Sequence, residues 1–229
     1  MLLMRSEKQI AAVLSILKRE MKKYRDPALT EIAERSRDPF KVLVSCILSL
    51  RTKDATTAKA SGRLFALADN PRTMAELPVQ KIAKAIYPVG FYRTKARRIK
   101  KICGELMKKY DGKVPDDFDT LMEFKGVGRK TANIVMVYGF GKPGIPVDVH
   151  VHVIANRLGW VQTKNADKTE LELRKILPGK YWMEVNTLFV VHGQNICQTK
   201  KPLCGACPVI KHCQYGPKYL ALFSNSKKR

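Results

Sequence analysis

The sequence has little negative charge and no long apolar segment. Only 20 of its 229 residues are Asp or Glu, although hydrophobic residues make up 45%, which is enough for a sizeable core. The apolar run at 42–50, with its two serines counted, has nine residues, whereas a membrane-spanning helix needs about 20. Charged residues near the N-terminus occupy the place where a signal peptide has its apolar stretch. We therefore expect a soluble protein that is not exported.

Positive charge is abundant instead. The chain has 43 Lys and Arg, a formal net charge of +23 and an isoelectric point near 9.9. Residues 81–113 contain eleven basic and two acidic side chains, and six of the nine residues in 93–101 are basic. Such a run is often only a solvated helix face, but an excess over the whole chain favours a polyanionic partner. Nucleic acid is the preferred partner, and an acidic membrane surface is the lesser alternative.

Apolar residues recur with helical spacing along nearly the whole chain, and no segment alternates as a strand does. The fold class is therefore predicted to be all-α. The helix at 129–138 is apolar nearly all round and is expected to be central. The expected helices are 6–24, 40–50, 54–67, 73–77, 80–87, one capped by Thr94 and ended by Asp111-Gly112, 117–124, 129–138, 148–158, 168–177 and 180–192.

A Gly126-Val127-Gly128 turn before a helix is a compact way to bind a phosphate, although alone it is more often an ordinary loop. Lys130 follows in the first turn of that helix. Most lysines are solvated surface residues, but desolvation and nearby positive charge would make this amine nucleophilic. Asp148 is predicted to cap the next helix, and its carboxylate can also stabilise positive charge on a substrate.

Four of the six cysteines fall within seventeen residues, in a C-x6-C-x2-C-x5-C pattern formed by Cys197, Cys204, Cys207 and Cys213. Four thiolates this close indicate a metal site rather than a disulfide framework. Their chemistry suits either zinc or an iron–sulfur cluster, and zinc is the default for four cysteines. Cys46 and Cys103 lie alone in apolar helical patterns and are expected to be buried packing residues.

Three segments together resemble the endonuclease III family of base-excision DNA glycosylases, which belongs to the helix-hairpin-helix superfamily. They are FKGVGRKTA at 124–132, VDVH at 147–150 and the four-cysteine cluster, and the likeness extends from about residue 41 to 213. The resemblance implies that Lys130 is the nucleophile and that Asp148 assists at the sugar. A Schiff base and β-elimination would then cut the strand, without a divalent metal. It also implies a [4Fe–4S] cluster on the four cysteines, and a lysine combined with this cluster favours oxidised pyrimidines such as thymine glycol.

The resemblance further implies two helical lobes with a central cleft. Residues 31–143 would form a six-helix lobe with the hairpin, and residues 1–30 and 144–229 a discontinuous lobe with the cluster. We expect an intracellular, nucleoid-associated monomer whose partner is damaged double-stranded DNA. The expected DNA-contacting residues are Arg51, Phe91, Gly126, Gly128, Lys200 and Lys201.

The chain departs from the family pattern at three positions. Arg51 stands where many members have Gln, Phe91 stands where Leu is usual, and Lys125 replaces a usual Pro. Arg51 is expected to fill the gap in the duplex. Phe91 either wedges into the base stack or staples its turn to the core, and Lys125 is expected to matter little. Two rival functions are a DNA-binding module without catalysis and a glycosylase that removes the base without cutting the strand.

Overall fold

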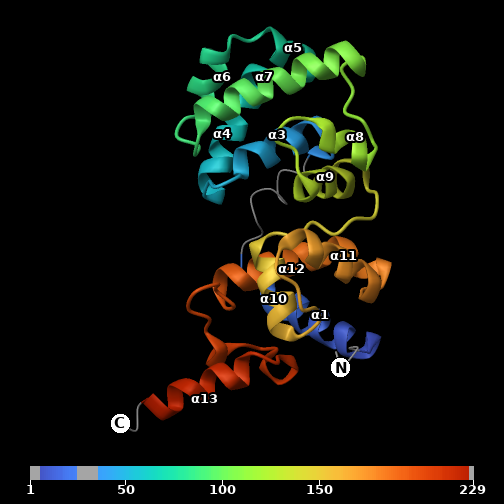
Figure 1. Ribbon diagram of the computed structural model, residues 1–229. Coiled ribbons are helices and arrows are strands. Elements are labelled where there is room, and N and C mark those ends of the chain that lie inside the picture. Colours follow the sequence, from blue (N-terminus) through green and yellow to red (C-terminus); the bar gives the residue numbers. More distant parts are fainter. Residues whose placement is uncertain (1–5, 25–35, 227–229) are drawn as a thin grey trace. The chain divides into compact units, whose positions relative to one another are not determined.

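The computed structural model describes residues 6–24 and 36–226, and these residues form helices joined by loops, with no strand among them (Figure 1). The all-α prediction is thus confirmed. Contacts divide the chain into two compact units, residues 27–144 and residues 1–26 together with 145–229. None of the described helices has both the length and the apolar character needed to cross a bilayer.

The unit of residues 27–144 is built around a buried helix, α3. Every residue in 42–48 is buried, and α3 packs against α4, α7, α9 and the π-helical turn η1. Asp38 caps α3, because its side chain accepts hydrogen bonds from the first backbone N–H groups of the helix. The described elements of this unit are α3 (Pro39–Ser49), α4 (Asp54–Leu67), α5 (Pro71–Glu76), α6 (Val79–Ile86), α7 (Tyr92–Lys109), α8 (Phe118–Glu123), α9 (Arg129–Ile134) and η1 (Val135–Gly139).

Helix α7 shows that part of the basic run serves the fold itself. Lys95 is buried, and its ammonium donates hydrogen bonds to the carbonyls of Leu48 and Leu50 at the C-terminal end of α3, at 2.8 and 2.5 Å. Lys100 does the same for α5, with its Nζ 2.8 Å from the carbonyl oxygen of Leu77. Arg63 of α4 donates to the carbonyl of Ala85 near the end of α6 at 2.8 Å. Cations placed there satisfy orphan carbonyls and oppose the helix dipole.

The start of α7 corrects one expectation. Thr94 was predicted to cap the helix, but α7 begins at Tyr92 with Phe91 at the N-cap position, and Thr94 lies exposed in the first turn. Phe91 has a left-handed φ of 57° and provides no side-chain cap. The hydrogen bonds of Lys95 instead tie this first turn of α7 to the end of α3. The end at Asp111-Gly112 is confirmed, since Tyr110 closes the helix and both following residues have positive φ.

The segment expected as one helix at 129–138 also differs. It is α-helical only to Ile134 and continues as the π-helical turn η1. At the end of η1, a Cβ on Gly139 would lie 2.9 Å from the Cα of Pro39, so only glycine permits this close approach to the start of α3. The wide turn and the glycine together bring this strongly apolar segment against α3.

The second unit joins α1 to the C-terminal half of the chain. Helix α1 packs on α12, which also packs against α10, and their apolar faces form a core of their own. Ser6 and Gln9 form a capping box at the start of α1. The described elements are α1 (Glu7–Met21), α10 (Val149–Leu158), α11 (Ala166–Ile176), the 3₁₀ turn η2 (Gly179–Tyr181), α12 (Trp182–Asn195), the 3₁₀ turns η3 (Cys204–Ala206) and η4 (Ile210–His212), and α13 (Gly216–Ser226).

Candidate active site and cysteine pocket

The Gly126-Val127-Gly128 turn lies between α8 and α9, as the motif predicts. Gly126 has φ +92°, which strains any other residue, and a Cβ there would lie 2.2 Å from the Nε of Arg98, so a side chain would also have to displace this arginine. Gly128 occupies the N-cap position of α9. Both glycines are exposed, whereas Val127 between them is buried and anchors the turn. The hairpin therefore presents backbone to solvent on a packed base.

Lys130 is the second residue of α9 and is half-buried. Its charge reaches Cys46, which lies in the middle of α3. Burial raises the pKa of the Cys46 thiol to about 12, and the positive charge of Lys130 acts in the opposite direction. The lysine thus lies beside the buried helix of its unit, rather than on a fully solvated face. Cys46 and Cys103 are both buried, as expected of packing residues.

Asp148 caps α10, which confirms its predicted structural role. Its Oδ1 accepts hydrogen bonds from the backbone N–H groups of His150 and Val151, each at 2.9 Å. These bonds fix the orientation of a half-buried carboxylate at the start of a helix. Asp148 belongs to the unit of α1 and α10–α13, whereas Lys130 belongs to the unit of α3–α9.

Two exposed loop residues, Arg51 and Phe91, lie side by side in the unit of α3–α9. The Cζ of Arg51 is 5.9 Å from the centroid of the Phe91 ring. A Cβ on Gly90 would lie 2.7 Å from the backbone oxygen of Arg51, so the two loops touch at a point where only glycine fits. Thr52 joins them further, because its hydroxyl accepts hydrogen bonds from the Gly90 N–H at 3.2 Å and from Lys95 at 3.1 Å.

Lys95 is a residue whose role the sequence analysis missed. It is one charge of the basic run, but it is only 4% exposed and donates to three acceptors, the carbonyls of Leu48 and Leu50 at the end of α3 and the hydroxyl of Thr52 on the loop that carries Arg51. Burial, and then the charge of Arg98, lowers the pKa of Lys95 to about 8. Its place between apolar Ile102 and Ile99 on the helical wheel is the available signal, since that spacing puts it on the inner face of α7.

The four clustered cysteines line a single pocket in the second unit. Most of the remaining lining is apolar, from Ile196, Pro202, Leu203 and Ile210. Burial raises the pKa of Cys197 and Cys204, and that of Cys207 to about 11. Within residues 6–24 and 36–226, no three potential ligands are close enough together to bind a single metal ion.

Arg157 and His192 surround this pocket, and neither was singled out by the sequence. Arg157 of α10 donates to the Sγ of Cys197 at 3.3 Å and to the carbonyls of Gln198 and Thr199 at 2.9 and 2.7 Å. His192 is buried, its Nε2 lies 3.7 Å from the Sγ of Cys207, and burial lowers its pKa to about 4. Arg157 thus holds the loop whose next residues, Lys200 and Lys201, are exposed.

Comparison with known proteins gives consistent matches over most of the chain. The model of the HhH-GPD superfamily base excision DNA repair proteins matches residues 44–179. The chain is 46% identical over 178 residues to Endonuclease III of Thermotoga maritima, covering 78% of this chain and 84% of that protein. It is 36% identical over 180 residues to Endonuclease III of Escherichia coli strain K12, covering 79% and 85%.

Solved structures agree with the sequence relatives. A non-covalent Endonuclease III–DNA complex matches with a TM-score of 0.83 and 33% identity, and a trapped Endonuclease III–DNA covalent intermediate with 0.81 and 32%. Each match covers 95% of this chain and 100% of the other. The family predicted from the hairpin, the aspartate and the cysteines is confirmed. The chain belongs to the endonuclease III family of the HhH-GPD superfamily, and it is a base-excision DNA glycosylase with AP lyase activity.

Proposed function

We propose that this enzyme removes oxidised pyrimidines of the thymine glycol type from duplex DNA, with Lys130 as the nucleophile and Asp148 as the assisting carboxylate. The observation that carries the proposal is the position of Lys130, directly after the hairpin and half-buried against the helix that contains Cys46. A covalent intermediate with DNA has been trapped for an Endonuclease III that is 32% identical to this chain. A lysine at this position supplies the amine that such an intermediate requires.

The chemistry follows from an amine and a carboxylate acting on a flipped nucleotide. The damaged base leaves the stack, which costs least where stacking is already poor. The Nζ of Lys130 attacks C1′ of the sugar, and the glycosidic bond breaks with its electron pair leaving on the base. Ring opening gives a protonated Schiff base, which acidifies the proton on C2′. Loss of that proton expels the 3′ phosphate by β-elimination, and the carboxylate of Asp148 stabilises the positive charge that develops at the sugar.

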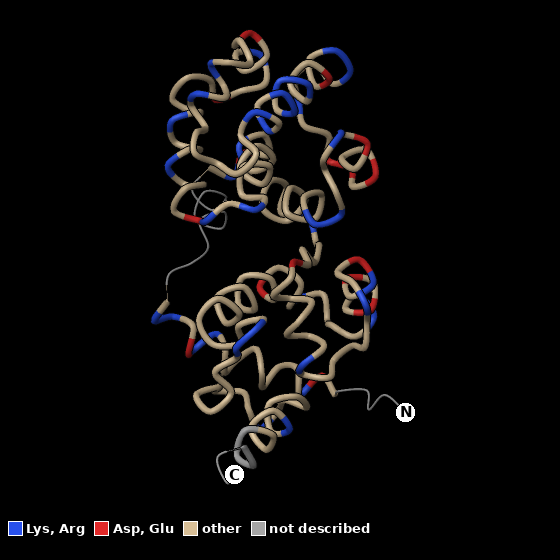
Figure 2. Tube along the Cα trace, turned by 60° about the vertical axis from the view of Figure 1, so that its left-hand side comes forward, with Lys and Arg blue, Asp and Glu red and all other residues tan. Residues whose placement is uncertain are grey.

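Residues of both units are proposed to contact the duplex. Gly126 and Gly128 present exposed backbone to a phosphate, and Lys200 and Lys201 add charge on the loop held by Arg157. Figure 2 shows lysines and arginines in both units. Phe91 is 63% exposed, which supports a wedge in the base stack over a staple to the core. Arg51 beside it is assigned to the gap that the flipped base leaves.

A [4Fe–4S] cluster is proposed for the pocket of Cys197, Cys204, Cys207 and Cys213. The residues fit such a group: four thiols face one apolar pocket, and Arg157 and the Gly216 N–H donate to sulfur, each at 3.3 Å. When bound, the group would crosslink the chain from the end of α12 to the start of α13. It takes no part in the steps above.

Borohydride trapping tests the proposal. A duplex with one thymine glycol is incubated with wild type, with Lys130→Gln and with Lys109→Gln as a control that removes an exposed lysine of α7. Wild type and Lys109→Gln are expected to give a covalent protein–DNA band, and Lys130→Gln none. The expected bands with thymine glycol, but not with a matched undamaged duplex, would support both the nucleophile and the lesion class.

Each of the other outcomes would reject one part of the proposal. Alkali-labile sites without a covalent band would mean base removal without the Lys130 Schiff base. A band on an abasic-site duplex but none on thymine glycol would leave the nucleophile and reject the lesion class. A band that persists in Lys130→Gln would reject the nucleophile. Strand cutting that requires added magnesium would contradict the elimination mechanism.

A further inference from the structure

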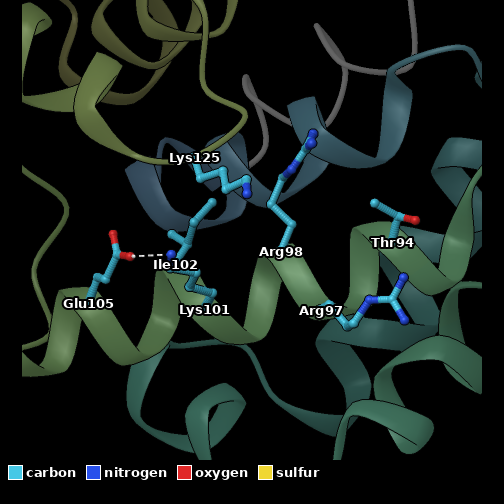
Figure 3. Close-up of a pocket in the computed structure, with 7 residues that line it drawn as sticks. All are labelled: Thr94, Arg97, Arg98, Lys101, Ile102, Glu105 and Lys125. Atoms are coloured by element: carbon cyan, nitrogen blue, oxygen red, sulfur yellow. Dashed lines mark ion pairs between the residues drawn. The ribbon is translucent and has the colours of Figure 1, made fainter.

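A basic pocket opens between α7 and the hairpin. Six of its lining residues belong to α7, and the seventh is Lys125, which immediately precedes the hairpin glycine (Figure 3). The cavity has a volume of about 230 Å³, well above what one water molecule needs. The lining residues are Thr94, Arg97, Arg98, Lys101, Ile102, Glu105 and Lys125.

The charges of this pocket are unbalanced. Glu105 is its one carboxylate among the lining residues, and that group lies 3.7 Å from Lys101. Arg97, Arg98 and Lys125 form no ion pair with a carboxylate of the residues that the structure describes. Three cations in one depression repel each other, and an anion placed among them would relieve that repulsion.

Arg97, Arg98 and Lys125 differ in this respect from other cations nearby. Lys95 and Lys100 of the same helix turn inward and bond helix-end carbonyls. Figure 3 shows the side chain of Lys125 directed toward that of Arg98, so that the two come together from two separate elements. Because its lining comes from two elements, this is a pocket. Charges on one helix face alone would form only a row along the surface.

The pocket is also continuous with the hairpin. The side chain of Arg98 lies over Gly126, so closely that a Cβ on the glycine would be 2.3 Å from the guanidinium carbon. An anion bound by Arg98 would therefore lie next to the exposed hairpin backbone. Phosphates of a DNA strand recur at short intervals, so a strand held at the hairpin offers another phosphate nearby.

We propose that this pocket binds a backbone phosphodiester of the duplex, in addition to the phosphate assigned to the hairpin, with Arg98 and Lys125 as its main ligands. The proposal rests on the proposed DNA grip of the hairpin and extends it by one contact. Arginine offers paired N–H donors that match phosphate oxygens, and lysine adds a point charge. Lys125, which the sequence suggested would matter little, becomes a binding residue.

The test is the salt dependence of binding to an undamaged duplex. Three proteins are compared: wild type, Arg98→Gln/Lys125→Gln and Lys108→Gln/Lys109→Gln. The control pair removes the same charge from the exposed last turn of α7. The plot of log binding constant against log salt concentration is expected to become shallower by about 1 in the pocket variant and by much less in the control. Arg98→Lys/Lys125→Arg keeps both charges and is expected to retain the wild-type slope, and melting curves check that each variant is folded.

Each alternative result has a definite meaning. Equal loss of slope in the pocket and control variants would overturn the site, because only net charge would matter. An unchanged slope combined with loss of inorganic phosphate binding, measured by calorimetry, would show a small-anion site and reject the DNA contact. A wild type that binds the duplex without salt dependence would instead refute the proposed phosphate grip as a whole, while the excision assay with thymine glycol still tests the catalytic proposal separately.

Discussion

The guanidinium carbon of Arg51 lies 5.9 Å from the centroid of the Phe91 ring, within range of a cation–π contact. Both residues have left-handed backbones, with φ of 54° and 57°, a conformation that is strained for side chains of this size. These are also two of the three positions at which the sequence analysis expects a departure from the family pattern. The two departures are therefore structurally paired, and they project together from adjoining loops.

Phe91→Ala is expected to lower kcat/KM on a lesion duplex by about tenfold, because a wedge in the base stack needs a large apolar side chain. The ring is 63% exposed, so the melting temperature should change little. Phe91→Leu, which keeps a large apolar side chain, should keep most of the activity. Single-turnover excision rates and thermal melts check this. Equal activity of the Ala and wild-type proteins would contradict a wedge.

Asp148→Asn separates helix capping from chemistry. Asn caps a helix about as well as Asp, so α10 should remain stable, whereas loss of the negative charge should slow base release by at least about a hundredfold. Asp148→Ala is the comparison, because it also removes the cap and should cost about 1 kcal/mol of unfolding free energy. Excision rates and urea unfolding, measured for both variants, separate the loss of chemistry from the loss of the cap. An active Asn variant would confine Asp148 to its structural role.

The helices could be predicted from the sequence because their signals are local. The 3.6-residue apolar period, the cap at Asp148 and the stop at Asp111-Gly112 lie within or beside each helix. Their ends differ from the predictions by a few residues, as frayed ends do. The hairpin and the cysteine pocket could also be predicted from the sequence, since each is formed mainly by residues close together in the chain.

Contacts between distant segments could not be predicted. Lys95 in the first turn of α7 donates to the carbonyl of Leu48, 47 residues earlier, and no local pattern encodes that pair. The contacts of Arg98 with Gly126 and of Arg157 with Cys197 also join segments that are distant in the sequence, so they could not be predicted either. A basic side chain in the sequence gives no sign of whether it caps a helix end or faces a phosphate. The net positive charge of the chain therefore overestimates how many basic residues are available to contact DNA.

Cys204→Ser should abolish the cluster. A serine hydroxyl is a poor substitute for a thiolate ligand, and loss of the crosslink between α12 and α13 should lower the melting temperature and the yield of soluble protein. Cys103→Ala is the matched control, because Cys103 is buried in the other unit and lines no such pocket. Visible absorbance and iron content per chain report the outcome. A Cys204→Ser protein with full iron content would disprove the ligand assignment.

Lys95→Met should destabilise the enzyme and change how its stability depends on pH. The variant leaves the carbonyls of Leu48 and Leu50 without their donor, which should cost about 2 kcal/mol of unfolding free energy near neutral pH. The pKa of Lys95 is about 8 in the folded chain, below its ordinary value of 10.5. Between those two values the unfolded chain binds more protons, so the contribution of this lysine to stability rises with pH.

The gap in unfolding free energy between wild type and Lys95→Met should therefore widen from about pH 7 to about pH 10. Urea unfolding at both values measures it, and Lys109→Met, which removes an exposed lysine of the same helix, should show a gap that stays nearly constant. Because Lys95 holds the loop of Arg51, the Met variant should also lose lesion binding at temperatures where it remains folded. A gap that narrows toward high pH would mean that the folded chain holds the Lys95 proton more tightly than the unfolded chain does, and would reject burial as the dominant influence on this lysine.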